Sequence, residues 1–314
     1  MKQLNFREEQ KVVAVSGRDL QKSQEFADKH QISKFYSDYE ALALDDQVQV
    51  VYIGITTHCH YEATKVFLNA GKSVLCEKPL GMNVEQTEEM IALAQSKKVF
   101  LMEAIWSRTF PVYQQLKRTL DQKTIGEVQH MVMTNGVSTK GPNLYVKEYG
   151  GGTVLEAAGD CIQLTLLAFG SEMPCKIQAS TVKFNENGVD LGLSVTLHFP
   201  QYRMATFDTD LRVDLPNTAF MAGSGGSIQI GSQFWCPTQL CVSTRKLKRK
   251  EDFPLPSGAK FPFNFANSEG LMYEADHVRQ CLQANLLESP LVPHQDSLLI
   301  ARIQKEIMSQ ISSQ

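Results

Sequence analysis

Strand-like and helix-like segments alternate along the first third of the chain, and this alternation most restricts how it can fold. Apolar runs rich in branched residues lie at 11–16, 48–55 and 99–104, with shorter strand segments in SKFYS and KSVLCEKP. Amphipathic segments stand between them, in DLQKSQEFADKH, DYEALALD, 60–70 and VEQTEEMIALAQSKK, the last with Asn83 as its expected N-cap. Strands that alternate with helices predict a parallel, doubly wound α/β sheet.

The pattern changes near Trp106. Helices are expected at about 110–121 and 156–169, and two more close the chain. The strand segments of this part follow one another: EVQHMVMTNGV, KIQASTVKF, LGLSVTLHF, RMATFDTDLRV, NTAFMAG and GSIQIG. Strands in succession predict an antiparallel sheet, broad enough to serve as an interface. We therefore expect an α/β domain at 1–104 and an α+β domain at 105–314.

Composition argues against several classes of protein. The chain has 314 residues and a net charge of −3, which gives no global case for binding nucleic acid or a membrane. No apolar run approaches the roughly 18 residues that span a bilayer. Seven single cysteines without a CxxC pair favour reduced thiols in a cytoplasmic protein, and no metal site is predicted. A basic run at 245–250 is interpreted as a solvated hairpin end, with a localisation signal or a phosphate patch as alternatives.

Two charged residues leave a buried strand together. Glu77 and Lys78 follow the apolar Val74–Cys76, and Pro79 then ends the strand. Ligands of parallel sheets gather beyond the carboxyl ends of the strands. A lysine there can pair with a cofactor or polarise a substrate hydroxyl or carbonyl. A surface ion pair is the alternative.

Arg18 follows the strand at 11–16, where dinucleotide-binding folds contact the adenosine ribose. An acidic residue at this position accepts the 2′-hydroxyl, whereas arginine suits a 2′-phosphate. Lys22 lies one helical turn later and could add a second positive charge. This pair favours NADP over NAD, and a solvated loop arginine is the alternative.

The usual opening of a dinucleotide fold is not found in this sequence. Such folds begin with a strand, a GxGxxG turn and a helix whose N-terminus holds the pyrophosphate. The segment before 11–16, MKQLNFREEQ, contains no glycine. In a sheet of order 3-2-1-4-5-6, the first strand separates the strands at 11–16 and 48–55, so both should lack a neighbour. Each unpaired buried amide would cost about 1–3 kcal/mol.

Ordered motifs along nearly the whole chain resemble the dimeric dihydrodiol dehydrogenases, a branch of the glucose–fructose oxidoreductase/inositol dehydrogenase (Gfo/Idh/MocA) family. These motifs are GRDLQKSQEFADKH, VVYIG, LNAGKSVLCEKPLGMN, FLMEAIWSRTFP, GGGTVLEAAGDCIQ, LPNTA, FWCPTQL and YEADHVRQCL. The resemblance implies a Rossmann-like domain lacking its first strand, followed by a domain with a large open antiparallel sheet that often forms a homodimer.

The resemblance also implies a chemistry and a site. Members of this branch are NADP-linked oxidoreductases that act on trans-dihydrodiols and on D-xylose. The EKP motif makes Lys78 the active-site lysine, with Glu77 beside it. Arg18 corresponds to the arginine that favours NADP, and Trp106 to a residue that lines the substrate pocket.

The chain departs from the family at the acid/base position. Glu156 stands where relatives have aspartate, Ala158 where they have glycine, and Asp160 where they have a tyrosine or histidine. A tyrosine near pKa 10 holds a proton at neutral pH, but an ordinary aspartate near 4 does not. Two carboxylates one helical turn apart raise at least one pKa, so Asp160, aided by Glu156, could still act in a dry site.

A second departure lies beside the nicotinamide position. Relatives have a Thr-Pro-Asn turn before a histidine, and here only His60 keeps its place, after Ile55-Thr56-Thr57-His58-Cys59. His58, Cys59 and His60 could suggest a metal site, but neighbouring residues at a strand end and a helix start rarely converge on one ion.

Two functional hypotheses follow. In the first, the protein is an NADP-dependent dehydrogenase in which Lys78 steadies the reacting oxygen and Asp160 with Glu156 takes the acid/base position. In the second, it is a catalytically degenerate family member that binds a sugar or a protein partner. The missing phosphate loop has two explanations as well, an incomplete sequence with Met1 inside the first helix, or a paralogue released from catalysis.

Overall fold

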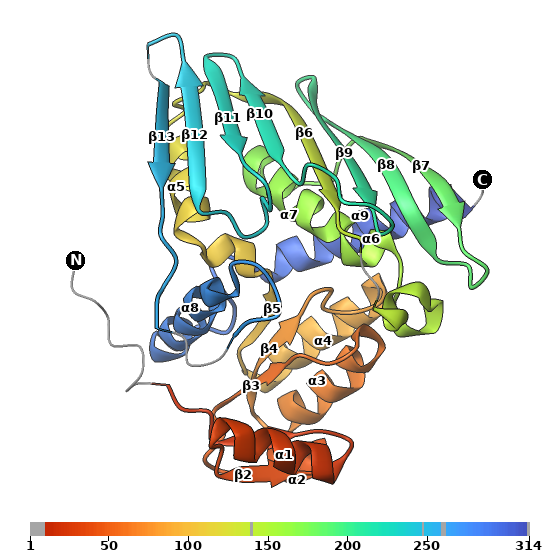
Figure 1. Ribbon diagram of the computed structural model, residues 1–314, viewed down its shortest axis with the longest axis vertical. Coiled ribbons are helices and arrows are strands. Elements are labelled where there is room, and N and C mark those ends of the chain that lie inside the picture. The colour runs from red at the N-terminus through yellow and green to blue at the C-terminus, as the bar shows by residue number, and fades with distance from the viewer. Residues whose placement is uncertain (1–9, 139–140, 247, 259–261, 313–314) are drawn as a thin grey trace.

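The computed structural model describes residues 10–138, 141–246, 248–258 and 262–312. Its first part is built from short parallel strands and the helices between them (Figure 1). The strands are β1 (Ala14–Ser16), β2 (Lys34–Tyr36), β3 (Val50–Ile53), β4 (Ser73–Glu77) and β5 (Leu101–Ala104). The helices are α1 (Leu20–His30), α2 (Tyr39–Ala43), α3 (His60–Asn69) and α4 (Val84–Lys97). The predicted alternation of strand and helix is thus confirmed.

The parallel strands form two separate sheets. β1 pairs only with β2, whereas β3, β4 and β5 pair in that order, all in parallel. Within the described chain, no strand pairing joins β1 to β3, which is the gap that the sequence predicted for the first strand. Exposure alternates along β3: Val50 and Tyr52 are 38% and 54% exposed, while Val51 and Ile53 on the other face are buried in the core.

The second part is dominated by one sheet of eight strands in the order β13-β12-β11-β10-β6-β9-β8-β7. Its strands are β6 (Val128–Gly136), β7 (Lys176–Phe184), β8 (Asp190–Phe199), β9 (Arg203–Asp210), β10 (Ala219–Gly223), β11 (Gly226–Ile230), β12 (Gln239–Thr244) and β13 (Lys248–Asp252). The prediction of a wholly antiparallel sheet is wrong at one pair, because β6 and β9 run in parallel, with Val132 opposite Thr206. The chain leaves β6, passes through helices to the far edge, and returns through β7 and β8, so that β9 enters alongside β6.

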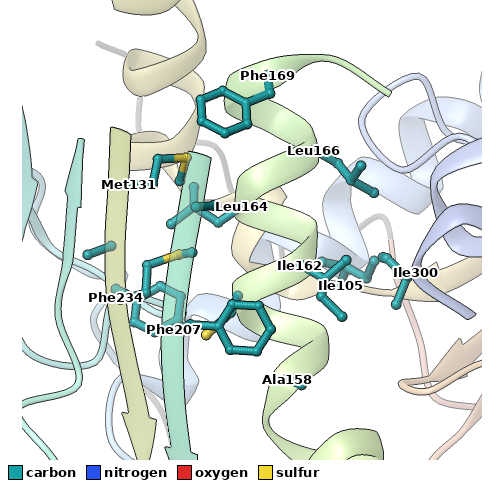
Figure 2. Packing of buried hydrophobic residues seen from close by; sticks show 14 of the residues in the cluster. Ile105, Met131, Ala158, Ile162, Leu164, Leu166, Phe169, Phe207, Phe234 and Ile300 are labelled. Carbon is teal, nitrogen blue, oxygen red and sulfur yellow. The ribbon is translucent and has the colours of Figure 1, made fainter. Parts of the chain in front are cut away.

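Helices cover one face of this sheet (Figure 1). They are α5 (Pro111–Asp121), α6 (Thr153–Glu156), α7 (Ala158–Phe169) and α9 (His294–Ser312), and α8 (Leu271–Gln283) lies nearer the first part. Figure 2 shows α7 between the sheet and α9, with Phe207 and Met131 on one side and Ile105 and Ile300 on the other. The core of the second part is therefore a layer of helices packed on a sheet.

The predicted helix at 156–169 is confirmed as α7, which begins two residues later, at Ala158. A separate short helix, α6 (Thr153–Glu156), precedes it and was not predicted, and Ala157 lies between the two. The backbone N–H of Val154, in the first turn of α6, donates to the buried Asp190 carboxylate at 2.8 Å.

The C-terminal helix returns to the first part and packs against α4. Arg302 pairs with Glu88 at 2.7 Å and Lys305 with Glu85 at 2.5 Å. Among the described residues, no single helix is long and apolar enough to cross a membrane. Residues 147–156 and 158–169 reach that length and apolar composition only together, as a pair bent by 43°.

The basic run lies on the β12–β13 hairpin, as its solvated-hairpin interpretation predicted. Lys248 and Lys250 are exposed, Arg249 lies 3.0 Å from Glu251, and residue 247 is outside the described residues. All seven cysteines are free thiols.

Candidate active site

Lys78 is held at the carboxyl end of β4 by the turn between α6 and α7. Its Nζ donates to the backbone carbonyl of Glu156 at 2.7 Å and lies 3.2 Å from the Glu156 carboxylate. The Lys78–Pro79 peptide bond is cis. The structure therefore brings together the two residues that the sequence placed 78 positions apart.

The charge of Lys78 is fixed by its neighbours. Burial opposes that charge, but Glu156, Asp160 and Glu77 outweigh it and raise the pKa of Lys78. The side chain keeps 25% of its surface exposed, so this ammonium can reach a molecule in the site. Lys78 is consequently a permanent cation and hydrogen-bond donor at neutral pH.

Asp160 lies in the first turn of α7, on the same side as Lys78. Its Oδ2 accepts from the side-chain amide of Asn135 at 3.1 Å, and that amide also donates to the Ala157 carbonyl at 3.0 Å. Burial raises the pKa of Asp160 to about 6, with Glu156 adding to the effect while Lys78 and Asn135 oppose it. The carboxyl can therefore gain and lose a proton near neutral pH, which an ordinary aspartate does not.

Glu77 is part of a second group of carboxyls. Tyr52 donates to its Oε1 at 2.5 Å. Glu274, at the start of α8, is 2% exposed, and burial followed by the charge of Glu77 holds its pKa well above the usual range. Glu77 thus lies between a phenol and a buried acid next to Lys78.

Trp106 lies in the short 3-10 helix Trp106–Thr109 that follows β5, stacked edge-on against Phe110 with ring centroids 5.3 Å apart. It lines one small cavity together with Lys78 and Asp160. The predicted substrate-contacting residue and the predicted catalytic residues are thus neighbours.

The glycine-rich turn before α6 holds this arrangement in place. Gly152 has φ +115°, and a Cβ there would lie 2.2 Å from Asp190 Oδ1. At Gly151 a Cβ would lie 2.5 Å from the carbonyl oxygen of Leu144. The turn therefore needs glycine at both positions to pack so closely.

His60 is buried rather than open to a ligand. Its Nδ1 lies 2.9 Å from the Pro79 carbonyl oxygen, and its Nε2 lies 3.0 Å from that of Ile55. The ring therefore joins the loop after β3 to the turn that carries Lys78. His58 turns elsewhere, with Nε2 at 3.2 Å from Cys59 Sγ, and the described residues contain no group of three His, Cys, Asp or Glu side chains suited to a metal.

Arg18 and Lys22 lie apart from this cluster, after β1 and in the first turn of α1. Both are exposed, and the described residues offer neither side chain a hydrogen bond or an ion pair. Asp19 caps α1 by accepting from the Lys22 N–H at 3.1 Å. Two unpaired cations thus stand at the carboxyl end of β1, a suitable place for a 2′-phosphate.

The fit of a nicotinamide dinucleotide is partial. The residues at the β4 end suit its reacting part, and those at the β1 end suit the ribose phosphate. The pyrophosphate turn of a dinucleotide fold follows the strand that lies between β1 and β3 in the sheet. The described residues contain no strand at that place, so no residue is assigned to the pyrophosphate.

Several residues of the site were not found from the sequence. Asn135, Tyr52 and Glu274 come from β6, β3 and α8 and were not singled out as site residues, although Tyr52 lies in VVYIG and Glu274 in YEADHVRQCL. Asn135 stands 25 positions from Asp160, and the packing of α7 on β6 brings them together. A buried asparagine in a strand is a weak signal by itself.

Comparisons with known proteins agree with this architecture. A family model described as "Oxidoreductase family, NAD-binding Rossmann fold" matches residues 1–105, and one for the GFO/IDH/MocA C-terminal domain matches residues 113–229. Trans-1,2-dihydrobenzene-1,2-diol dehydrogenases from Xenopus tropicalis and Homo sapiens are both 41% identical to the chain. Their alignments cover 96% and 97% of this chain and 89% and 90% of the relatives.

Solved structures share the fold at lower identity. Levoglucosan dehydrogenase, in complex with NADH and levoglucosan, superposes with a TM-score of 0.83 at 18% identity, covering 96% of this chain and 88% of that one. A 3-ketoreductase from Actinomadura kijaniata, in complex with NADP and TDP-benzene, gives 0.81 at 21% identity, covering 96% and 90%.

Proposed function

Because the chain belongs to the Gfo/Idh/MocA family of oxidoreductases, we propose that it oxidises a trans-dihydrodiol or a D-xylose-like sugar with NADP. The observation that carries this proposal is that Lys78, which pairs with Glu156, and Asp160 line one small cavity together with Trp106. A fixed cation next to a carboxyl with a pKa of about 6 is what the oxidation of an alcohol needs.

Each residue of the cluster has a separate task in this proposal. A bound nicotinamide would accept the hydride from the substrate carbon. Lys78 donates a hydrogen bond to the reacting hydroxyl, and ionised Asp160 accepts the proton that this hydroxyl releases. Glu156 holds Lys78 in position through its carbonyl and carboxylate, and Trp106 forms a wall of the substrate pocket.

The cofactor would be recognised at two places. Arg18 and Lys22 would bind the 2′-phosphate, which supports NADP over NAD. Glu77 would lie next to the nicotinamide end beside Lys78. His60 would act indirectly, because its ring nitrogens already contact the carbonyls of Pro79 and Ile55.

Cofactor binding and turnover test this function in sequence. NADPH and NADH are titrated by fluorescence against the wild type, against Arg18→Ala/Lys22→Ala, and against Lys29→Ala, an exposed control in the same helix. We expect the double variant to lose at least about tenfold in NADPH affinity while NADH affinity stays unchanged. Turnover is then measured with trans-dihydrodiols and D-xylose. No NADPH binding at millimolar concentration refutes the proposal.

One observation favours the alternative, a family member that binds but does not catalyse: a carboxyl, Asp160, occupies the acid/base position. Binding without turnover, with activity gained in Asp160→Tyr, would support this alternative and locate the defect at that position.

We also propose a homodimer through the open face of the eight-stranded sheet. Val132 and Phe220 are opposite each other on β6 and β10, near the middle of the sheet, and are 46% and 40% exposed. A second copy of the chain would bury this apolar pair. The free cysteines support a reducing, cytoplasmic location.

A further inference from the structure

The small cavity that Lys78, Asp160 and Trp106 line has room for a single water molecule. Its volume is about 10 Å³, near the smallest that admits one water. Polar side chains from β5, α7, α9 and the turn after β4 line it: Lys78, Glu103, Asp160, Gln163 and Gln304. A polar cavity of this size has the partners that a buried water needs.

Glu103 is the unexplained member of this lining. It is the penultimate residue of β5 and is only 4% exposed. Its Oε1 accepts from the Leu80 N–H at 3.0 Å, but its Oε2 is buried and has no partner among the described residues. A buried carboxyl oxygen left unpaired is costly, which indicates a partner such as water.

The other groups around the cavity are largely committed. The Gln163 amide N–H donates to the Tyr113 hydroxyl at 3.1 Å, and its Oε1 accepts from Arg108 at 3.0 Å. Gln304 donates to the Val154 carbonyl at 2.8 Å. The charged side chains that line the cavity and can hold the water are Lys78, Glu103 and Asp160.

We propose that one water molecule occupies this cavity and that Glu103 is a positioning residue that exchanges a proton with Asp160 through it. Protonated Asp160 gives its proton to the water, which passes one of its own to the Glu103 carboxylate, and the reverse transfer restores the start. No bond to carbon changes and no electrons are transferred. The inference rests on the proposed function, since the exchange affects turnover only if Asp160 takes the substrate proton.

The charges around both carboxyls agree with such an exchange. Asp160 faces Lys78, Glu156 and Glu77. Glu103 faces Arg108 and Lys78, and burial raises its pKa despite them and despite the nearby Ser297 hydroxyl and Leu80 N–H. Both acids therefore bind a proton more readily than ordinary carboxyls, which permits transfer between them.

Gly159 provides a variant that removes the water and keeps both acids. It lines the cavity in the first turn of α7, and a Cβ there would meet only Gln304 Nε2, at 3.5 Å, an ordinary contact. Gly159→Ala would fill the cavity with a methyl group, and alanine is the better helix former. Gly231→Ala, where a Cβ meets nothing within 4 Å, is the matched control.

The test is a ¹³C NMR titration of side-chain carboxyls in the full chain, which requires neither cofactor nor turnover. We expect Asp160 to titrate in two coupled steps in the wild type and in Gly231→Ala. The step that Asp160 shares with Glu103 should disappear in Gly159→Ala and in Glu103→Gln, whose amide oxygen can still accept from Leu80. A high-resolution crystal structure should show the water in the wild type and not in Gly159→Ala.

Two results would overturn the inference. One is a two-step curve that persists in Gly159→Ala, because the coupling would then act through space without water. The other is an empty cavity in the wild-type crystal. Absence of turnover with the whole substrate panel counts against the proposed function alone, so the two failures are distinguishable.

Discussion

Asp160 decides what the candidate site can do, because its protonation state selects between a proton donor and a proton acceptor. The surroundings of Asp160 have opposing effects on its pKa. Burial and Glu156 raise the pKa and favour the neutral acid, whereas Lys78 and Asn135 lower it and favour the carboxylate. The outcome is an acid that titrates near physiological pH. Small changes at these neighbours should therefore be visible in the pH dependence of activity.

We expect kcat/KM for alcohol oxidation to rise with pH through about 6 and to level off above it, because Asp160 must be ionised to accept a proton. In Lys78→Met the cation that lowers this pKa is lost, so activity should fall at least about 100-fold and the remaining rise should move to higher pH. Lys65→Met, a half-exposed lysine beside Glu62 and outside the site, is the control. A flat wild-type profile between about pH 5 and about pH 7 would refute the role of Asp160.

At the scale of single residues, site residues at a strand end or a helix start could be predicted from the sequence. The buried side chains that contact them could not. Lys78, Glu156 and Asp160 were found because a strand end and a helical spacing are local properties. Asn135 and Glu103 were not, because both lie within strands where polar residues are common. Only the packing of β5 and β6 against α7 gives them partners in the site.

At the scale of elements, α6 depends on a capping residue from a distant hairpin. Asp190 at the start of β8 is 1% exposed, accepts from Val154 N–H, and has its pKa raised to about 6 by burial. Gly152, with its positive φ, lets the backbone reach this carboxylate. The position of Glu156, and through it of Lys78, therefore depends on a contact between 154 and 190.

Asp190→Ala leaves the buried N–H of Val154 without a partner. We expect the free energy of unfolding to fall by about 1–3 kcal/mol, measured by urea denaturation. Glu186→Ala, an exposed acid in the loop before β8, should change it by less than about 0.5 kcal/mol. Equal effects of the two substitutions would show that the cap does not stabilise the fold.

Asp45 connects β2 to the loop after α2. Lys34 pairs with it at 2.8 Å, and Gln47 and Tyr36 donate further hydrogen bonds, which lowers the pKa of Asp45 to about 2. Because the folded pKa lies below the ordinary value of 3.8, this stabilisation is present above pH 3.8 and is lost as pH falls towards 2.

Asp45→Asn should therefore lower the thermal midpoint at neutral pH and make progressively less difference as the pH falls below about 4. Circular dichroism at several pH values measures this, with Asp46→Asn, an exposed neighbour, as the control. A difference that stays constant down to the acid limit would contradict the assigned pKa.

Helix starts with a local signal were predictable, and a short helix held by a tertiary contact was not. Asn83 was expected to cap α4, and its side chain accepts from Gln86 N–H at 2.8 Å. The helix α6 has no such local signal, because the carboxylate that its Val154 N–H reaches belongs to Asp190, more than thirty residues later in the chain.

At the scale of the whole molecule, the eight-stranded sheet presents one face to helices and leaves the other open (Figure 1). The sequence predicted this sheet from consecutive strand segments. It could not predict the parallel β6–β9 pair, because pairing across some seventy residues depends on the path of the chain and not on local pattern. The division into domains at 104/105 stays a prediction.

If the open face is the dimer interface, Phe220→Lys should shift the chain from dimer to monomer in sedimentation velocity. A charge at the centre of the face would have to be buried without a partner. Lys250→Glu, on the exposed edge strand β13, should leave the dimer intact. A wild-type chain that is already monomeric at high micromolar concentration would refute the interface.

The division of the parallel strands into two sheets also has a consequence for how the protein fluctuates. In the described chain no ladder of backbone hydrogen bonds joins β1 and β2 to β3, β4 and β5. The segment from β1 to α2 can therefore open as its own cooperative unit, and its amide protons should exchange with solvent sooner than those of β4. Arg18 and Lys22 belong to that unit and Lys78 does not, so the two ends of the candidate cofactor site would differ in local stability.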